Sequence, residues 1–138
     1  MLEYTLCQEV FKKNLGSVDV RIGEFSKRTG LSVDTLRYYE KEKLLTPQRD
    51  FNDRRVYCEA DIRWIEFIIR LKDTGMPLKE IRRYARLRAK GDNTMNERLE
   101  MLIAHKANLE AQIEKLNAHK ERLGDKIEFY RKEISKKT

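Results

Sequence analysis

Hydrophobic residues in the first two thirds of the chain fall into short blocks with spacings of three and four, separated by glycine, proline and polar turns. Such spacing predicts amphipathic helices that each bury one face. The first block places Ile22, Phe25 and Ser26 on one helical face, and Gly30 follows where a left-handed C-terminal cap is expected. Ser32 can then cap a second short helix by accepting a backbone N–H.

This second helix turns Val33 and Leu36 inward and projects Arg37, Tyr39 and Lys41 outward. Two short helices joined by a tight turn that contains glycine predict a helix-turn-helix, which lays its second helix in the DNA major groove. The outward residues suit contacts with DNA phosphates. The alternative for Arg37 and Tyr39 is a solvated face with a packed ring.

The helical pattern then stops at Leu44-Leu45-Thr46-Pro47, and polar residues gather around Asn52-Asp53 before Val56 and Tyr57, which suit a strand. This segment predicts a small hairpin, or wing. A third helix follows, because Cys58-Glu59-Ala60-Asp61 has the layout of a capping box with cysteine in place of serine or threonine. It carries Trp64 and the apolar residues Ile62, Ile65, Phe67, Ile68, Ile69 and Leu71.

Gly75 ends the third helix, and Pro77 starts a fourth at a position where its missing N–H costs little. The apolar stripe of the fourth helix comprises Leu78, Ile81, Tyr84, Ala85 and Leu87.

From Thr94 to about Ser135 the chain contains no proline and one glycine, Gly124, which predicts a single helix about 60 Å long. Its apolar residues alternate steps of three and four, as in the seam of a two-stranded coiled coil. The seam comprises Leu99, Leu102, Leu109, Ile113, Leu116, Leu123, Ile127, Tyr130 and Ile134. Lys106 and Lys120 occupy seam positions too. Because such a seam cannot stay exposed on a monomer, we expect it to pair with another helix, although periodicity alone leaves the orientation of the two helices open.

We therefore expect a mostly α protein that consists of a winged helix-turn-helix DNA-binding domain and a long C-terminal dimerisation helix. Residues 1–19 would be an extension, either disordered or the product of a misassigned start codon. Residues 20–91 would form the DNA-binding domain with its helical linker pair, and residues 92–138 the coiled coil.

The charge supports an acidic partner. The formal net charge is +7, and residues 61–91 hold nine Lys or Arg against four Asp or Glu, whereas residues 92–138 hold ten against nine. A basic excess on the side of the helix-turn-helix favours nucleic acid. No stretch approaches a membrane span, and two cysteines are too few for a disulfide framework, so we expect a reduced, cytoplasmic protein.

The run Thr35-Leu36-Arg37-Tyr38-Tyr39-Glu40 closely resembles the recognition helix of the MerR family of bacterial transcription regulators. The resemblance implies an antiparallel coiled-coil homodimer that binds an inverted repeat in double-stranded promoter DNA, bends and untwists it, and acts on RNA polymerase there. The segments 71–78 and 91–94 look most like the branch of the family that senses aldehydes and thiol stress.

Two positions depart from the family pattern. The family wing carries Gly-Tyr-Arg where this chain has Asp53-Arg54-Arg55, and the family usually has glycine at Lys43, after the second helix. The motif and the charge pattern together assign DNA contact to Lys27, Arg28, Arg37, Tyr39, Arg49, Arg55 and Tyr57. Tyr38 is assigned to the core.

Cys58 is a candidate thiol sensor. A helix N-terminus and the neighbouring Arg54 and Arg55 would favour its thiolate, and the alternative is a small capping residue without chemistry. Related sensors usually carry their reactive cysteine further along the third helix, at the position that aligns with Arg70. Cys7 lies in the extension.

Two other classes of function fit the residues less well. Metal sensing needs soft ligands near the end of the long helix, but no cysteine follows Cys58, and His105 and His119 are fourteen residues apart. A thiol enzyme would need a base, and neither histidine lies near Cys58 in sequence. We thus expect no enzymatic activity, metal or cofactor, and no membrane partner. The alternative to a transcription regulator is a DNA-architectural or excisionase-like protein without effector sensing.

Overall fold

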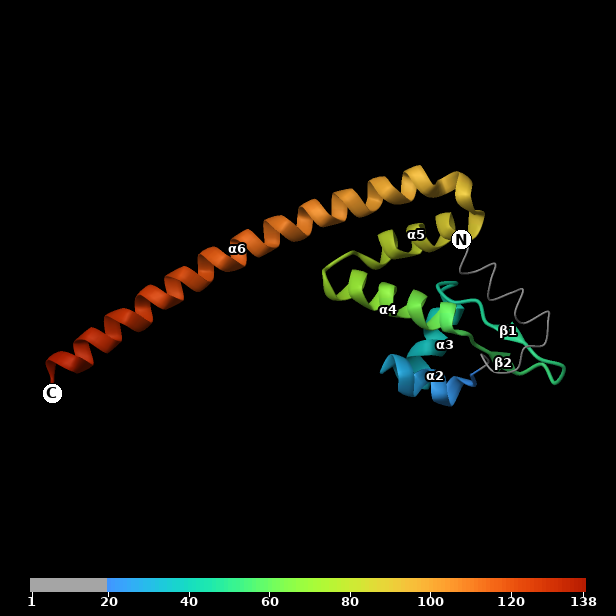
Figure 1. Cartoon of the computed structure of the whole chain (residues 1–138), viewed down its shortest axis with the longest axis horizontal. Coiled ribbons are helices and arrows are strands. Elements are labelled where there is room, and N and C mark those ends of the chain that lie inside the picture. The colour runs from blue at the N-terminus through green and yellow to red at the C-terminus, as the bar shows by residue number, and fades with distance from the viewer. Residues whose placement is uncertain (1–19) are drawn as a thin grey trace. The chain divides into compact units, whose positions relative to one another are not determined.

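The computed structural model describes residues 20–138, which are mostly helical as predicted (Figure 1). The expected extension, residues 1–19, lies outside the described residues. The elements in chain order are α2 (Ile22–Thr29), α3 (Val33–Lys41), β1 (Gln48–Arg49), β2 (Arg55–Val56), α4 (Glu59–Asp73), α5 (Leu78–Lys90), the 3-10 turn η1 (Asp92–Thr94) and α6 (Met95–Lys136).

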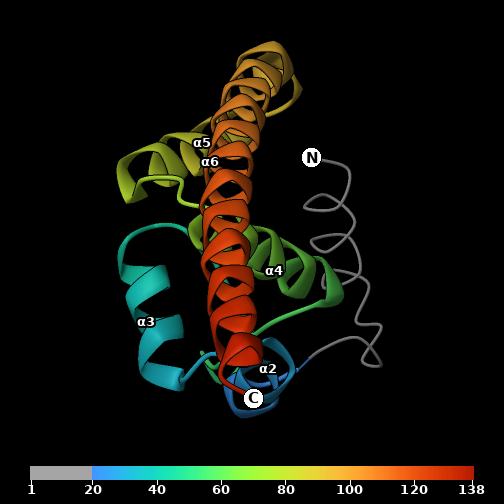
Figure 2. The ribbon, with the colours of Figure 1, turned by 90° about the vertical axis from the view of Figure 1, so that its left-hand side faces the viewer.

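The predicted helix-turn-helix is confirmed, together with both of its caps. Gly30 ends α2 with a φ of 76°, and its N–H donates to the Ser26 carbonyl at 3.0 Å. Ser32 begins α3, because its hydroxyl accepts the Thr35 backbone N–H at 3.1 Å. Helix α2 packs against both α3 and α4 (Figure 2).

The predicted wing is a two-stranded antiparallel hairpin that projects beyond the helices of the same unit (Figure 1). Gln48 pairs with Val56, and Arg49 pairs with Arg55. The wing turn is held by the Asp50 carboxylate, which accepts the N–H groups of Asn52 and Arg54 at 2.9 and 3.0 Å. These hydrogen bonds, led by the one from Arg54, lower the pKa of Asp50.

Both departures from the family pattern adopt the backbone conformation that glycine favours. Lys43 has a φ of 62° and Asp53 a φ of 59°, and both values lie in the left-handed region that side chains with a Cβ rarely enter. The chain therefore forms both turns with residues that carry a Cβ.

One hydrophobic core joins the helix-turn-helix, the wing and the pair α4 and α5. Its fully buried side chains come from all of these elements and are Phe25, Leu36, Tyr57, Ile65, Ile68 and Ile81. Trp64 lies at the centre of the α4–α5 contact: its indole N–H donates to the Leu44 carbonyl at 2.6 Å, and its ring stacks on Tyr84 with centroids 6.0 Å apart. The core thus fixes the second helix and the wing on one scaffold.

The chain divides into two compact units, with the boundary after Leu99, inside α6. The expected domain boundary at residues 91 and 92 precedes it and stays a prediction. Helix α6 is 42 residues long and continuous, as the sequence indicated. Of the helices formed by residues 20–138, none has both the length and the apolar character needed to cross a bilayer.

Candidate nucleic-acid interface

The outer face of α3 carries a row of solvent-exposed side chains one helical turn apart. Asp34, Arg37, Tyr38 and Lys41 are exposed, whereas Leu36 is buried. The side chain of Arg37 is 59% exposed, and its Nη1 lies 4.0 Å from the Asp34 carboxylate, at the limit of an ion pair. The guanidinium group of Arg37 is therefore accessible to an anion of another molecule.

The expected orientation of the two tyrosines is wrong. Tyr39 is only 3% exposed and belongs to the core, whereas Tyr38, which was assigned to the core, is 43% exposed. The helical period explains why the buried and the exposed tyrosine are reversed, because Tyr39 lies three residues after the buried Leu36 and so shares its face. Tyr38 is thus the ring of this pair that lies on the α3 surface, beside Arg37.

The two arginines of the wing converge on one carboxylate of α3. Nε of Arg55 donates to Oε2 of Glu40 at 2.6 Å, and Nη2 of Arg49 lies 3.6 Å from the other oxygen, Oε1. The hydrogen bond to Glu40 raises the pKa of Arg55. Arg49 also donates to the Asp53 carbonyl at 2.9 Å. Both guanidinium groups are partly exposed, so Glu40 fixes their positions while they remain accessible to solvent.

Tyr57, which was expected to contact DNA, is instead a core residue. It is 1% exposed and stacks on Phe25 with ring centroids 4.2 Å apart. Its backbone pairs with Val20 through hydrogen bonds of 2.8 and 2.9 Å, which turns the ring inward. Burial raises the pKa of its hydroxyl to about 12, and that hydroxyl has no hydrogen-bond partner among residues 20–138.

The two basic residues of α2 differ. Lys27 is exposed, as expected. Arg28 is bound to Glu59 at the start of α4, with N···O distances of 2.6 and 2.8 Å, and this pair ties α2 to α4. A DNA contact by Arg28 therefore competes with a contact inside the protein.

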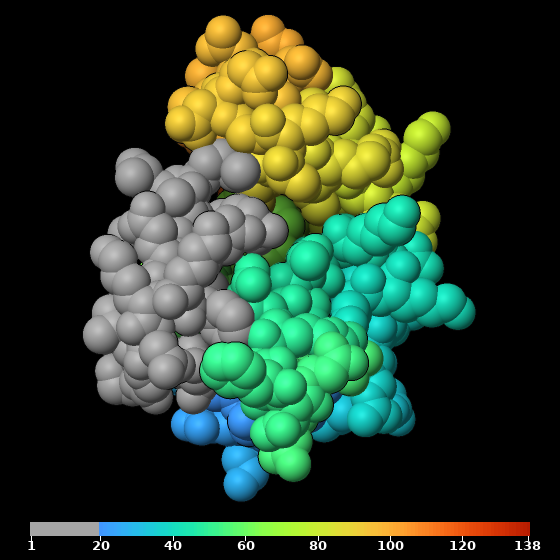
Figure 3. All heavy atoms as spheres, turned by 90° about the vertical axis from the view of Figure 1, so that its right-hand side faces the viewer, coloured from blue at the N-terminus to red at the C-terminus, as the bar shows by residue number. Residues whose placement is uncertain are grey.

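Phe51 is a surface feature that the sequence reasoning missed. It lies at the wing turn, and its side chain is fully exposed at 103%. The wing occupies the face seen in Figure 3, next to the residues around α3. The available signal was an aromatic residue inside an otherwise polar turn.

Cys58 caps α4 as the sequence predicted. Its backbone N–H donates to the Asp61 carboxylate at 3.0 Å, which forms the expected capping box. The residue is buried, and its sulfur is in a disulfide bond rather than a free thiol, unlike the reactive group expected of a sensor. A sensing reaction at this position therefore requires the reduced form.

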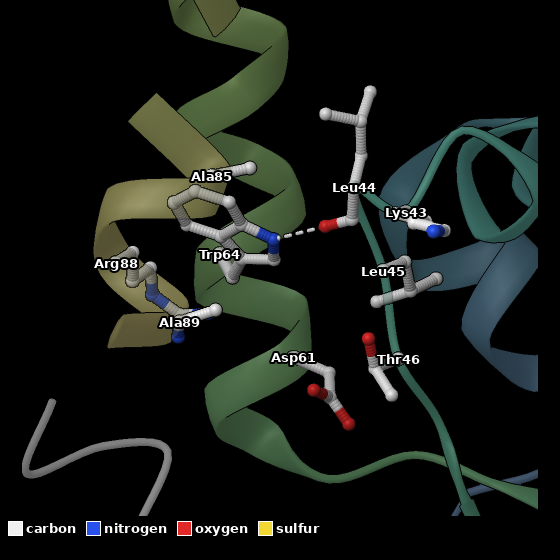
Figure 4. A pocket seen from close by; sticks show the side chains of 9 residues that line it. All are labelled: Lys43, Leu44, Leu45, Thr46, Asp61, Trp64, Ala85, Arg88 and Ala89. Atoms are coloured by element: carbon white, nitrogen blue, oxygen red, sulfur yellow. Dashed lines mark hydrogen bonds between the residues drawn. The ribbon is translucent and has the colours of Figure 1, made fainter. Parts of the chain in front are cut away.

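Asp61 lines a small cavity of about 50 Å³ with Trp64 and Arg88 (Figure 4). Burial raises the pKa of Asp61 to about 6, against the opposing effects of the hydrogen bond from Cys58 and the charge of Arg88. The cavity has room for only a few water molecules, which is too little for a drug-sized ligand. In the part of the chain that the structure describes, no three His, Cys, Asp or Glu side chains come together as a metal site would require.

Comparison with known proteins places these features in one family. The family described as MerR HTH family regulatory protein matches residues 20–87, and the family described as MerR, DNA binding matches residues 62–125. An HTH-type transcriptional regulator of Haemophilus influenzae is 37% identical over 108 residues, which cover 78% of this chain and 80% of the relative. The regulator AdhR of Bacillus subtilis is 37% identical over 84 residues, or 60% of each chain.

Solved structures agree with this assignment. HiNmlR, a MerR family regulator lacking the sensor domain and bound to promoter DNA, has a TM-score of 0.75 and 34% identity, with 83% of this chain and 91% of that chain covered. A MerR family regulator from Bacillus thuringiensis has a TM-score of 0.69 and 28% identity, with coverage of 79% and 96%. These relatives are transcriptional regulators and not enzymes. The chain therefore belongs to the MerR family of helix-turn-helix transcriptional regulators.

Proposed function

We propose that this regulator binds an inverted repeat in promoter DNA as a homodimer, and that each copy presents α3 and the wing as one continuous contact surface. The observation that carries the proposal is the shared carboxylate of Glu40, which draws Arg49 and Arg55 of the wing onto α3. Because Arg37 lies one turn before Glu40 on the same helix, three guanidinium groups gather at one surface.

A surface of this kind suits DNA phosphates. Arginine recognises phosphate in a planar, bidentate geometry, and such contacts supply most of the affinity but little sequence information. We assign phosphate contacts to Arg37, Arg49, Arg55 and Lys27, and a groove contact to Tyr38 in place of the buried Tyr39. Phe51 at the wing turn would approach the same duplex. Tyr57 supports the wing from inside.

The first test is a footprint of the purified protein on DNA upstream of its own gene. We expect protection of one symmetric element between the promoter hexamers. Arg37→Ala should abolish protection at the wild-type protein concentration, whereas Arg122→Ala, which removes an exposed arginine from α6, should preserve it. A protein that protects no such element, or that binds without any effect on transcription, would be architectural.

The coiled-coil seam supports the homodimer. The seam residues Leu99, Ile113, Leu116, Leu123, Ile127, Tyr130 and Ile134 are between 49% and 66% exposed. Leu102 and Leu109 are half-buried. We infer that these nine residues pair with a second copy in antiparallel orientation, which holds two DNA-binding units at a fixed spacing. Fixed spacing would let the dimer bend and untwist the DNA between its half-sites and so control RNA polymerase in the cytoplasm.

For the stimulus we propose aldehydes or other electrophiles. The segments 71–78 and 91–94 resemble the corresponding branch of the family, and AdhR is among the similar proteins. Cys58 in its reduced form is the candidate sensor. The test treats reduced wild-type and Cys58→Ser protein with a thiol-reactive aldehyde and follows promoter activity. Serine keeps the cap, so basal binding should persist while the response is lost; an unchanged response would remove Cys58 from the mechanism.

A further inference from the structure

The seam of α6 contains two lysines whose surroundings distinguish one pairing register from the others. Lys106 and Lys120 occupy seam positions between apolar residues. Lys106 Nζ lies 3.9 Å from the Glu110 carboxylate one turn later on the same helix. Burying the seam against a second copy would cover on the order of 1,000 Å² per copy, which is enough for a stable dimer. The seam lysines would then need partners at the edge of the interface.

We propose that two copies of α6 pair in the antiparallel register that sets Ile113 opposite the partner's Leu116, and that Glu110 of each copy lies between its own Lys106 and the partner's Lys120. This inference rests on the antiparallel homodimer proposed above and adds to it the register and the residues that select it.

The length of the seam is the first argument. In this register Leu109 lies opposite the partner's Lys120, and Lys106 opposite the partner's Leu123. The layers continue outward to both ends of the helix, with Leu102 opposite Ile127, Leu99 opposite Tyr130 and Met95 opposite Ile134 of the partner. A shift by one heptad leaves either Tyr130 and Ile134 or Met95 and Leu99 without apolar partners. The proposed register therefore buries the most apolar surface.

Charge is the second argument. The partner's Lys120 lies level with Leu109, and Glu110 follows on the side of the helix that faces it. In the two registers shifted by a heptad, Lys120 lies level with Leu102 or Leu116, and none of the immediate neighbours of these leucines is acidic. Only the proposed register gives Lys120 a carboxylate at the seam edge.

Gly124 is the third argument. A Cβ at Gly124 would meet no atom within 4 Å, so the single chain has no steric need for glycine at this unfavourable helix-interior position. In the proposed register, Gly124 lies beside the Lys106 side chain of the partner. The missing side chain leaves room for the lysine stem to run out of the seam toward solvent.

Spin-label distances test the register directly. Asp125 is exposed and points away from the seam, so an Asp125→Cys label in a background of Cys7→Ser and Cys58→Ser reports the offset between the two helices. We expect an axial separation of about 30 Å between the two labels. A separation of about 40 Å or about 20 Å would overturn the register and leave the antiparallel dimer intact. Labels with no axial offset, or a monomer, would overturn the proposed dimer itself.

A charge exchange tests the role of Glu110. Glu110→Lys gathers three lysines at each edge, so the dissociation constant of the dimer should rise about ten-fold or more at low salt. Adding Lys120→Glu places one carboxylate between two lysines again and should restore dimerisation. The matched control Glu114→Lys makes the same charge change on the outer face and should have little effect. Without rescue by the double variant, the proposed contact between Glu110 and the partner's Lys120 is wrong.

Discussion

At the scale of single residues, Tyr38 and Tyr39 show how neighbouring rings take opposite roles. Tyr39 is packed in the core beside Leu36, and Tyr38 lies on the surface beside Arg37. Tyr39→Ala should therefore destabilise the fold by about 3 kcal/mol, as expected when a large buried ring is removed. Tyr38→Ala should leave stability within about 0.5 kcal/mol and weaken DNA binding. Urea unfolding and DNA titration of both variants separate the two roles, and the opposite result would contradict our assignment of the contact ring.

Lys43 carries backbone strain that glycine would relieve. A φ of 62° costs a residue with a Cβ about 1–2 kcal/mol. Glycine avoids this cost, but it loses more conformational entropy on folding, and this loss offsets part of the gain. Lys43→Gly should therefore raise the free energy of unfolding by roughly 0.5–1 kcal/mol. Lys43→Ala is the control, because it removes the charge and keeps the Cβ. Equal stabilisation by alanine and glycine would show that charge, not strain, matters at this position.

Asp61 makes stability depend on pH in a defined direction. Burial raises its pKa from 3.8 to about 6, so the folded protein binds the proton more tightly than the unfolded chain. The stability that Asp61 contributes is therefore present below about pH 4 and is lost as pH rises to about 6, by about 3 kcal/mol. Asp61→Asn, which can still accept the Cys58 N–H, should remove this loss. If the free energy of unfolding falls equally steeply between pH 4 and 7 in the variant and the wild type, Asp61 is not the source of the pH dependence.

At the scale of elements, the wing and α3 act together because Arg49 and Arg55 of the wing both contact the Glu40 carboxylate of α3. Arg55 is bound to Glu40 and partly exposed, so it can reach a phosphate while it stays oriented. Arg55→Ala should weaken binding similarly across DNA sequences and lower the slope of log affinity against log salt by about 1. The matched control Arg122→Ala should keep the wild-type slope. A variant that loses affinity only for one sequence would make Arg55 a base-reading residue instead.

The helix and turn boundaries follow from local signals. The caps at Gly30, Ser32 and Cys58 each form hydrogen bonds with residues no more than four positions away, so their effect is readable in the sequence. The wing was harder to define, because strands of two residues are too short to show which side is buried. Residue spacing therefore predicts the wing itself but does not determine on which side of it the Tyr57 ring lies.

At the scale of the whole molecule, dimerisation depends on one continuous seam. Leu116 lies at its middle and is 65% exposed in the single chain. Leu116→Lys should convert the dimer into a monomer and lower operator affinity, because each half-site would then bind alone. Ala118→Lys, on the outer face of the same helix, should remain dimeric. Sedimentation at micromolar concentration distinguishes the two states, and a stable dimer of the Leu116 variant would show that the seam is assigned to the wrong face.

The sequence by itself determined the order of the elements, the positions of their ends and the continuous 42-residue helix, since caps, turns and hydrophobic period act between residues close in the chain. Its hexapeptide and charge also identified the family. Only the tertiary structure decided that Tyr57 is buried on Phe25, that Arg28 is bound to Glu59, and that Glu40 collects the two wing arginines. These contacts join residues 9 to 32 positions apart, and no local signal specifies which distant surface a side chain will meet when the core closes.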